Sequence, residues 1–303
     1  MKSFPEKSCR KPKYQLQRIK AIRYNISKRG KFLDRWIQTL ARYIRFIFIL
    51  SFLLTAWSPP TEVNAEAKKE TPAAFKAPII LYHRFGPVVA DGMTITTDVF
   101  ESHLKYLRDK GYTVIPLRQL VNFYLRKGPQ PPPRSVVIVV DDGHKTVYTD
   151  MLPLVKKYRI PITLFLYPSA ISNASYAMTW DQVRALKKTG LFDLQSHTYW
   201  HPNFNKEKKR LKPAEYEKFV DMQMKKAKEK LEKELGAGVD MLAWPFGLYN
   251  DELGKKAEEA GYIAAFTIVR RHTNPSDNIM ALPRYLLTNA DRGIRFERLI
   301  NNE

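Results

Sequence analysis

One stretch, residues 135–143, constrains the fold more than any other part of the chain. It reads SVVIVVDDG, so five apolar residues run without a break and stop at two adjacent carboxylates, Asp141 and Asp142. A short Val/Ile run preceded by prolines and followed by a glycine is typical of a strand buried on both faces, as in parallel sheets. The aspartates then lie at the carboxyl end of a central strand, where α/β proteins build active sites. An Asp-Gly pair is also ordinary turn chemistry, which this stretch alone leaves open as the alternative.

The chain on either side of this strand alternates between strand-like and helix-like segments. About seven strands separated mostly by helices predict a parallel α/β fold, and the strand count favours a (β/α) barrel over a doubly wound sheet. Pro153 is expected either to kink its helix or to mark where that helix starts. The charge run over 206–212 is interpreted as a solvated face. The strands are predicted at 79–82, 112–115, 135–140, 162–167, 192–195, 241–244 and 262–269, and the helices at 98–109, 117–126, 147–158, 180–188, 213–235 and 251–260.

The amino-terminal part of the chain has a different character. Residues 1–57 hold 14 Lys or Arg against two acidic residues, which is +12 of the total formal charge of +21. Residues 46–57 are almost entirely apolar, a length that suits the apolar core of a secretory signal better than a spanning helix of about 20 residues. We therefore predict a basic leader with a signal sequence over 1–65, with an uncleaved membrane anchor as the alternative. A linker over 66–77 and one catalytic domain over 78–303 follow, and the domain is expected to be exported to the periplasm or beyond the cell.

Charge and cysteine content exclude several function classes for this domain. The leader accounts for most of the positive charge and leaves +9 elsewhere, so we expect no nucleic-acid partner. Cys9 is the only cysteine and lies in the leader, so the domain has no cysteine to serve as a nucleophile, disulfide partner or metal ligand. A metal site there must use His, Asp or Glu.

Two further strand ends carry residues suited to chemistry. His197 and His201 stand four residues apart after the predicted strand 192–195, in a segment where Pro202 favours a loop. Imidazoles at this spacing suit one metal ion, although one of them serving only as a structural residue is the alternative. With a carboxylate from another strand end they would form the open three-ligand site of a hydrolytic metal enzyme. Residues 243–247 (AWPFG) form a turn that can aim a backbone N–H into a site.

Taken in order, these three motifs resemble those of the polysaccharide deacetylases of carbohydrate esterase family four, the nodulation-type deacetylase homology domain. The family's Thr-Phe-Asp-Asp-Gly corresponds to residues 139–143 (VVDDG), its His-Ser/Thr-x-x-His to residues 197–201 (HTYWH), and its Arg-x-Pro-Tyr to residues 243–246 (AWPF). The resemblance covers residues 78–290. It implies a distorted seven-stranded (β/α) barrel that binds one divalent metal, with zinc expected and cobalt or nickel as alternatives.

The resemblance also implies roles for individual residues. Asp141 matches the general base of the family. Phe246, which follows Pro245, stands where the family has the tyrosine whose backbone N–H helps to form the oxyanion hole, and a backbone donor survives this change of side chain. The metal ligands implied by the resemblance are Asp142, His197 and His201.

Two departures from the family pattern bear on the base and the acid. The arginine that pairs with the base is replaced by Ala243, and we hypothesise that Arg284 supplies this charge from another strand. The family's carboxyl-terminal Leu-x-His, which gives the general acid, is absent. However, a Leu-Tyr-His sequence ending at His83 closes the first strand, as in a subgroup that acts on exported poly-N-acetylglucosamine biofilm polymers. We therefore expect His83 to be the acid, with His272 and His144 as alternatives.

The function implied is metal-dependent hydrolysis of N-acetyl groups on the N-acetylglucosamine units of an exported polysaccharide, with poly-β-1,6-N-acetylglucosamine as the expected polymer in a bacterial cell envelope. Peptidoglycan, chitin oligomers and O-acetylated xylan are alternative substrates. An inactive, membrane-tethered sugar-binding module is the alternative from another class, and retention of both aspartates and both histidines argues against it. The candidates for stacking on sugar rings are Tyr167, Trp180, Trp200 and Trp244.

Overall fold

The computed structural model describes residues 75–303 of the chain. The predicted leader over 1–65 lies outside the described residues, as does nearly all of the predicted linker. Within residues 75–303, no helix is both long enough and apolar enough to cross a membrane.

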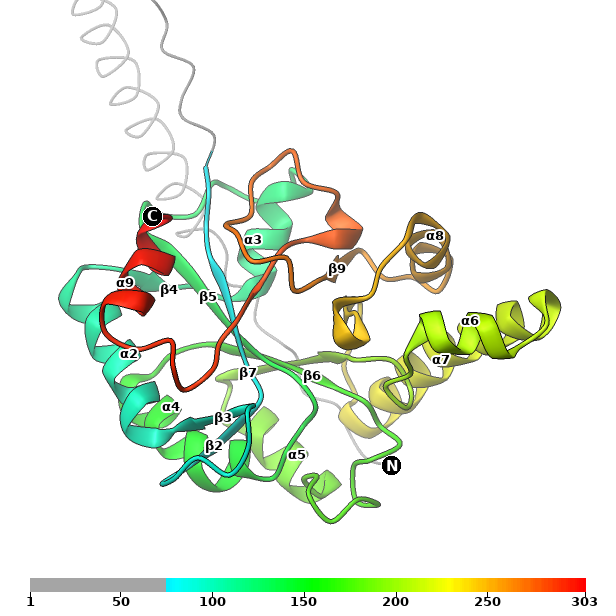
Figure 1. The fold of residues 1–303 in the computed structure, drawn as a ribbon, viewed down its shortest axis with the longest axis horizontal. Coiled ribbons are helices and arrows are strands. Elements are labelled where there is room, and N and C mark those ends of the chain that lie inside the picture. Colours follow the sequence, from blue (N-terminus) through cyan, green and yellow to red (C-terminus); the bar gives the residue numbers. More distant parts are fainter. Residues whose placement is uncertain (1–74) are drawn as a thin grey trace, which may run out of the picture. The chain divides into compact units, whose positions relative to one another are not determined.

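A parallel sheet organises the described residues (Figure 1). Its strands follow the order β10–β1–β5–β6–β7–β8–β9, and every neighbouring pair in this order is parallel. A short further strand, β4 (Thr113–Val114), pairs with β5 outside this path. The curled parallel sheet with helices around it confirms the predicted distorted (β/α) barrel. The strand bounds are β1 Ile79–Tyr82, β5 Ser135–Val140, β6 Ile162–Leu166, β7 Phe192–Ser196, β8 Met241–Ala243, β9 Ala264–Phe266 and β10 Tyr285–Leu286.

One short segment near the carboxyl terminus touches both edges of this sheet. Leu282 forms an isolated parallel bridge with Phe266 at the end of β9. Three residues later, Tyr285 pairs with Ile80 of β1. Residues 282–286 therefore join the last strand to the first and bring the curled sheet towards closure.

The helices alternate with the strands, as expected of βα units. The predicted bounds of 180–188 and 213–235 agree with the structure. The predicted helix over 147–158 begins instead as a π-helical turn, η1 (Val147–Met151), and continues as α4 with Pro153 in its first turn, where a missing N–H does no harm. The helices, shown around the sheet in Figure 1, are α2 Thr97–Asp109, α3 Leu117–Tyr124, α4 Leu152–Tyr158, α5 Trp180–Lys188, α6 Phe204–Arg210, α7 Pro213–Leu235, α8 Asp251–Glu259 and α9 Ile294–Asn301.

Side-chain alternation along β5 separates two apolar cores. Val136, Ile138 and Val140 belong to the larger core, which includes residues of the surrounding helices. Val137 and Val139 point to the other face and pack with residues of α3 in the inner core. Because successive strand residues face opposite sides, Asp141 continues the inner set. The strand thus delivers its first carboxylate to the inside of the barrel.

Candidate active site

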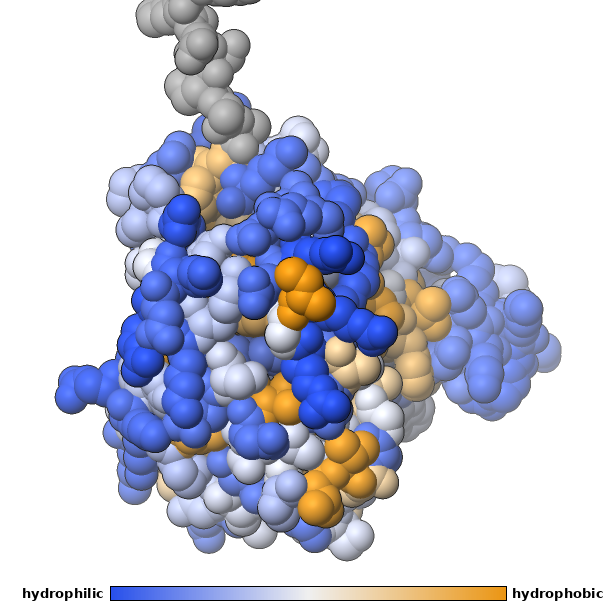
Figure 2. Space-filling view, turned by 60° about the vertical axis from the view of Figure 1, so that its left-hand side comes forward, coloured by the Kyte–Doolittle hydropathy of each residue, from blue (hydrophilic) through white to orange (hydrophobic). Residues whose placement is uncertain are grey.

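A cavity of about 520 Å³ opens at the carboxyl ends of the strands. Segments that follow β1, β5, β6, β7, β8 and β9 all contribute to its lining, as expected of parallel α/β folds. The face of the molecule seen in Figure 2 is mostly hydrophilic, with separate apolar groups. The cavity brings together most of the residues predicted from the sequence, namely His83, Asp141, Asp142, His197, His201 and Phe246.

Asp141 is paired with Arg284 inside the barrel. The guanidinium donates two hydrogen bonds to the carboxylate, from Nη1 to Oδ1 at 2.8 Å and from Nη2 to Oδ2 at 2.9 Å, while its Nε donates to the carbonyl oxygen of Thr267 at 2.9 Å. Asp141 is 2% exposed and Arg284 is fully buried. Burial by itself would raise the pKa of Asp141, but the charge and hydrogen bonds of Arg284, together with the nearby imidazoles of His197 and His83, outweigh it and lower this pKa to about 2. Asp141 is therefore a carboxylate at neutral pH.

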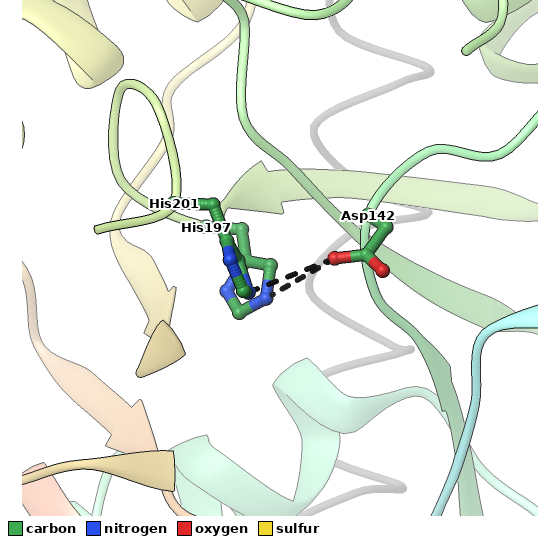
Figure 3. A group of neighbouring side chains, drawn as sticks. All are labelled: Asp142, His197 and His201. Atoms are coloured by element: carbon green, nitrogen blue, oxygen red, sulfur yellow. Dashed lines mark ion pairs between the residues drawn. The ribbon is translucent and has the colours of Figure 1, made fainter. Parts of the chain in front are cut away.

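Asp142, His197 and His201 point toward one another (Figure 3). Oδ1 of Asp142 lies 3.6 Å from Nε2 of His197 and 3.8 Å from Nε2 of His201. One ligand atom from each of the three residues lies within 4.8 Å of the others. Nitrogen and oxygen atoms bound at about 2.0–2.2 Å in a tetrahedral zinc site are about 3.4 Å apart, so this spacing fits a single ion after a small adjustment.

The protonation states of these side chains also suit a metal. Burial lowers the pKa of His197 to about 3 and lowers the pKa of His201, so both imidazoles are neutral at pH 7 and keep a lone pair for a metal. Nδ1 of His197 lies 2.8 Å from the carbonyl oxygen of Ala243. A proton on Nδ1 satisfies this carbonyl and leaves Nε2 as the ligand atom. Burial and the nearby charge of Asp141 raise the pKa of Asp142. The three residues therefore fit a divalent ion.

The backbone at these positions adopts conformations that most residues avoid. Asp142 has φ 76°, Thr198 has φ 64° and His201 has φ 60°, all in the left-handed region. Gly143, with φ 76°, must be a glycine also for lack of space, because a Cβ there would lie 2.6 Å from Cδ2 of Leu166. Such strain costs about 1–3 kcal/mol per residue and gathers at functional sites.

The turn over 245–247 presents a backbone donor to the same cavity. Phe246 has φ 57° and ψ 13°, and its side chain is 53% exposed. The N–H groups of Gly247 and Leu248 donate to the carbonyls of Trp244 and Pro245, whereas the Phe246 N–H has no acceptor within residues 75–303. Pro245 is buried behind the cavity and shapes the turn. The Phe246 ring packs edge-on against His201, with ring centres 4.6 Å apart.

His83 lines the cavity directly after β1. Its Nδ1 is buried and has no hydrogen-bond partner within the described part of the chain. Burial lowers the pKa of His83, and the carboxylates of Asp141 and Asp142 oppose this effect. The ring is thus placed to exchange a proton with a molecule in the cavity.

The two alternative acids lie elsewhere. Nε2 of His272 lies 3.0 Å from the carbonyl oxygen of Leu299, and Nδ1 of His144 lies 2.8 Å from the Thr146 hydroxyl. Neither histidine lines the cavity.

Only two of the four residues predicted to stack on sugar rings line the cavity. Tyr167 and Trp244 line the cavity, whereas Trp180 and Trp200 do not. Trp200 packs against Phe219, with ring centres 5.5 Å apart. A further aromatic residue that the sequence did not single out, Tyr176, lines the cavity and hydrogen-bonds to Tyr167 through the two hydroxyls at 2.5 Å.

Comparison with known proteins agrees with this geometry. The family model for polysaccharide deacetylase matches residues 128–265. The poly-beta-1,6-N-acetyl-D-glucosamine N-deacetylase of Staphylococcus aureus (strain MRSA252) is 27% identical over 211 residues, which cover 68% of this chain and 71% of that protein.

Two solved structures share the fold. The Streptococcus pyogenes deacetylase PplD in complex with acetate superimposes with a TM-score of 0.67 at 21% identity, covering 75% of this chain and 99% of the other. IcaB from Ammonifex degensii superimposes with a TM-score of 0.64 at 24% identity, covering 71% and 93%. Residues 128–265 therefore match the polysaccharide deacetylase family, and the sequence relatives support a deacetylase of the hydrolase class, whereas the two solved structures show the shared fold.

Proposed function

We propose that this protein removes N-acetyl groups from N-acetylglucosamine units of an exported polysaccharide, poly-β-1,6-N-acetylglucosamine, with the help of one divalent metal ion. The observation that carries the proposal is the convergence of Asp142, His197 and His201 beside an ionised Asp141 in one cavity. The polymer is chosen because the Staphylococcus aureus relative is named for it. The basic leader and its apolar run support export to the cell envelope.

Asp142, His197 and His201 would hold the ion. Two imidazoles and one carboxylate form a ligand set typical of catalytic zinc, and cobalt or nickel can take the same donors. When bound, the ion polarises the acetyl carbonyl and makes a bound water more acidic.

The remaining residues divide the proton transfers between them. Asp141, kept ionised by Arg284, takes a proton from the attacking water. The Phe246 N–H, fixed by the turn that Pro245 begins, donates a hydrogen bond to the oxygen on which negative charge develops. His83 gives a proton to the departing amine, which otherwise leaves poorly. The products are acetate and a free amine on the sugar.

The proposal is tested by acetate release from poly-β-1,6-N-acetylglucosamine. The full-length protein is assayed after chelation and again after addition of zinc, cobalt or nickel, beside peptidoglycan, chitin oligomers and acetylated xylan. We expect release that needs the metal, is greatest on the β-1,6 polymer and is lost in His197→Ala. Release only from another of these substrates would contradict the proposed polymer, and full release after exhaustive chelation would contradict the role of the metal.

A further inference from the structure

The loop that carries the two histidines, residues 197–201, is held by a buried side chain of α7. Gln223 is fully buried, and its Oε1 accepts hydrogen bonds from two successive backbone N–H groups, those of Tyr199 at 3.1 Å and Trp200 at 3.0 Å. These two amides immediately precede His201. A single side chain thus fixes the backbone from which the second histidine extends.

The two histidines differ in how their rings are supported. Nδ1 of His197 has the carbonyl of Ala243 as a partner, and the His197 N–H donates to the Leu166 carbonyl at 2.7 Å. The ring of His201 makes no hydrogen bond to another residue within residues 75–303. It packs against the rings of Phe246 and His197, each at 4.6 Å, and Tyr167 at 5.4 Å between ring centres. Metal-binding histidines almost always use their second nitrogen to fix the ring. For His201 the direction of the ring therefore depends on its backbone.

That backbone is strained and needs external support. Thr198 and His201 both have positive φ, which costs about 1–3 kcal/mol each. The other hydrogen bonds of the loop leave the amides of Tyr199 and Trp200 to Gln223. The Ser169 N–H donates to the Tyr199 carbonyl at 3.1 Å, the Ser196 hydroxyl accepts from the Thr198 N–H at 3.3 Å, and the Thr198 hydroxyl accepts from the His201 N–H at 3.3 Å.

Further buried contacts hold α7 next to the end of β7. The buried hydroxyl of Tyr262 lies 2.9 Å from the Ser196 hydroxyl and 3.1 Å from the carbonyl oxygen of Met224, the neighbour of Gln223 on α7. Trp200 also packs on Phe219, one turn earlier on the same helix. This buried network joins the end of β7, the loop and the middle of α7.

We propose that Gln223 is a positioning residue for metal binding, acting through the amides of Tyr199 and Trp200 to aim His201 at the site it shares with Asp142 and His197. The inference rests on the proposed function, because it takes these three residues as metal ligands. Gln223 itself touches no reacting group.

Two substitutions separate the hydrogen bonds from the packing. Gln223→Met keeps the length and unbranched shape of the side chain but removes the acceptor oxygen, which leaves two amides without a partner. Gln223→Glu keeps an acceptor in the same place and should restore the support. Both variants preserve the contacts of the side-chain stem.

The test is a zinc titration of the full-length protein against a chromophoric chelator. We expect Gln223→Met to bind zinc about 10- to 100-fold more weakly than the wild type, and Gln223→Glu to bind more like the wild type. Equal affinity in the wild type and Gln223→Met would overturn the inference and leave the proposed function intact. A wild type that binds no zinc would overturn both.

Hydrogen exchange gives a second measurement that needs no metal and no variant. In metal-free wild-type protein the amides of Tyr199 and Trp200 should exchange much more slowly than an exposed loop amide such as that of Val89. Exchange at the rate of the exposed amide would contradict the proposal even if Gln223→Met failed to fold.

Discussion

Replacing Arg284 with methionine should change both the stability and the pH dependence of this enzyme. The substitution removes the only cation that hydrogen-bonds to Asp141 within the described residues, and it does so where Asp141 is 2% exposed. Breaking a buried pair by removing one partner costs about 3–5 kcal/mol, because the other charge stays buried. We expect a loss of this size in the free energy of unfolding at pH 7.

The same change should move the pKa of Asp141 upward. In the wild type this pKa is lowered to about 2, so the ionised carboxylate stabilises the fold above its ordinary pKa, and this contribution is lost as the pH falls through about 2. Without Arg284 the effect of burial dominates, and a loss of about 3 kcal/mol corresponds to an upward shift of about two pKa units. The acid limb of kcat/KM should move to higher pH, and the stability deficit of the variant should shrink as the pH is lowered.

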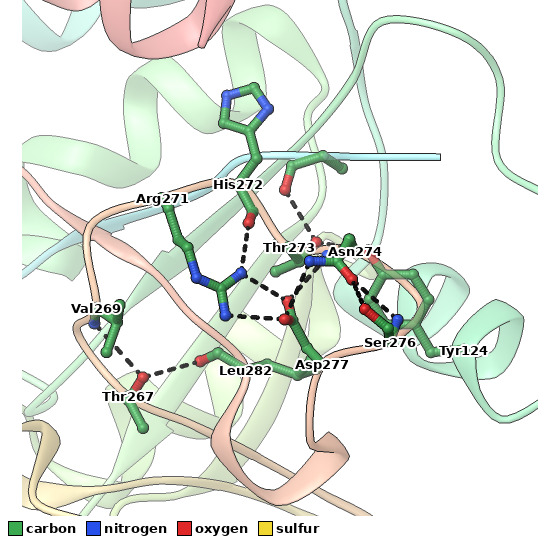
Figure 4. Close-up of polar contacts among 11 residues, drawn as sticks. Tyr124, Thr267, Val269, Arg271, His272, Thr273, Asn274, Ser276, Asp277 and Leu282 are labelled. Atoms are coloured by element: carbon green, nitrogen blue, oxygen red, sulfur yellow. Dashed lines mark hydrogen bonds and ion pairs between the residues drawn. The ribbon is translucent and has the colours of Figure 1, made fainter. Parts of the chain in front are cut away.

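The assay combines chemical denaturation at pH 7 and pH 3 with the pH profile of kcat/KM for acetate release, and zinc content is measured at each pH. Arg271→Met is the matched control, because Arg271 makes a similar two-bond pair with Asp277, at 2.8 and 2.9 Å, in the loop after β9 (Figure 4). The Arg271 side chain is 47% exposed, and Asp277, at 7%, also accepts hydrogen bonds from Asn274, so the loss of Arg271 should cost less than the loss of Arg284 and leave the profile unchanged. An Arg284→Met variant with wild-type stability and an unshifted acid limb would refute the reasoning.

Three further predictions concern the cavity. Asp141→Asn should abolish acetate release while zinc still binds at one equivalent, and an active variant would remove Asp141 from the role of base. His83→Gln should lower kcat by about 100-fold or more, whereas His272→Gln should leave it unchanged, and the reverse order in steady-state assays would exchange their roles. Gly247→Ala should lower the melting temperature and the activity together, because Gly247 has φ 67° and an added Cβ would lie 2.4 Å from Cγ1 of Ile268. A variant with the wild-type melting temperature would show that the turn adjusts without cost.

The sequence was most informative where chemistry and periodicity coincide. The unbroken apolar run of β5 predicted a strand buried on both faces, and strand alternation then explains why Asp141 faces the inside of the barrel. The ligand loop was predicted because two histidines follow a strand directly. The bounds of α5 and α7 were predicted because apolar residues recur at helical spacing, a glycine follows the carboxyl end of each helix, and α7 begins at a proline.

Other features of the structure were not predicted, because their sequence patterns are short or unspecific. The charge run at 206–212 was interpreted as a solvated face, and its Lys and Arg residues are indeed exposed, but the sequence did not reveal that most of the run lies in helix α6. This helix begins after Asn203, whose side chain accepts from the Lys206 N–H, and it buries Phe204. Strand β10 has two residues, which is too short for a pattern of period two. Nothing in the sequence around Gln223 distinguishes it from other polar residues of a helix. Its proposed role depends on hydrogen bonds to residues more than 20 positions earlier.

The segment that joins the two edges of the sheet also carries the partner of the proposed base. Leu282 bridges to β9, Tyr285 pairs with β1, and Arg284 lies between them with its side chain on Asp141, 143 residues earlier in the sequence. The charge that keeps Asp141 ionised therefore comes from the same segment that joins the two edges of the sheet. A chain that ends before residue 284 lacks both the closing segment and this charge. Closure of the barrel and ionisation of the proposed base therefore depend on the same few residues.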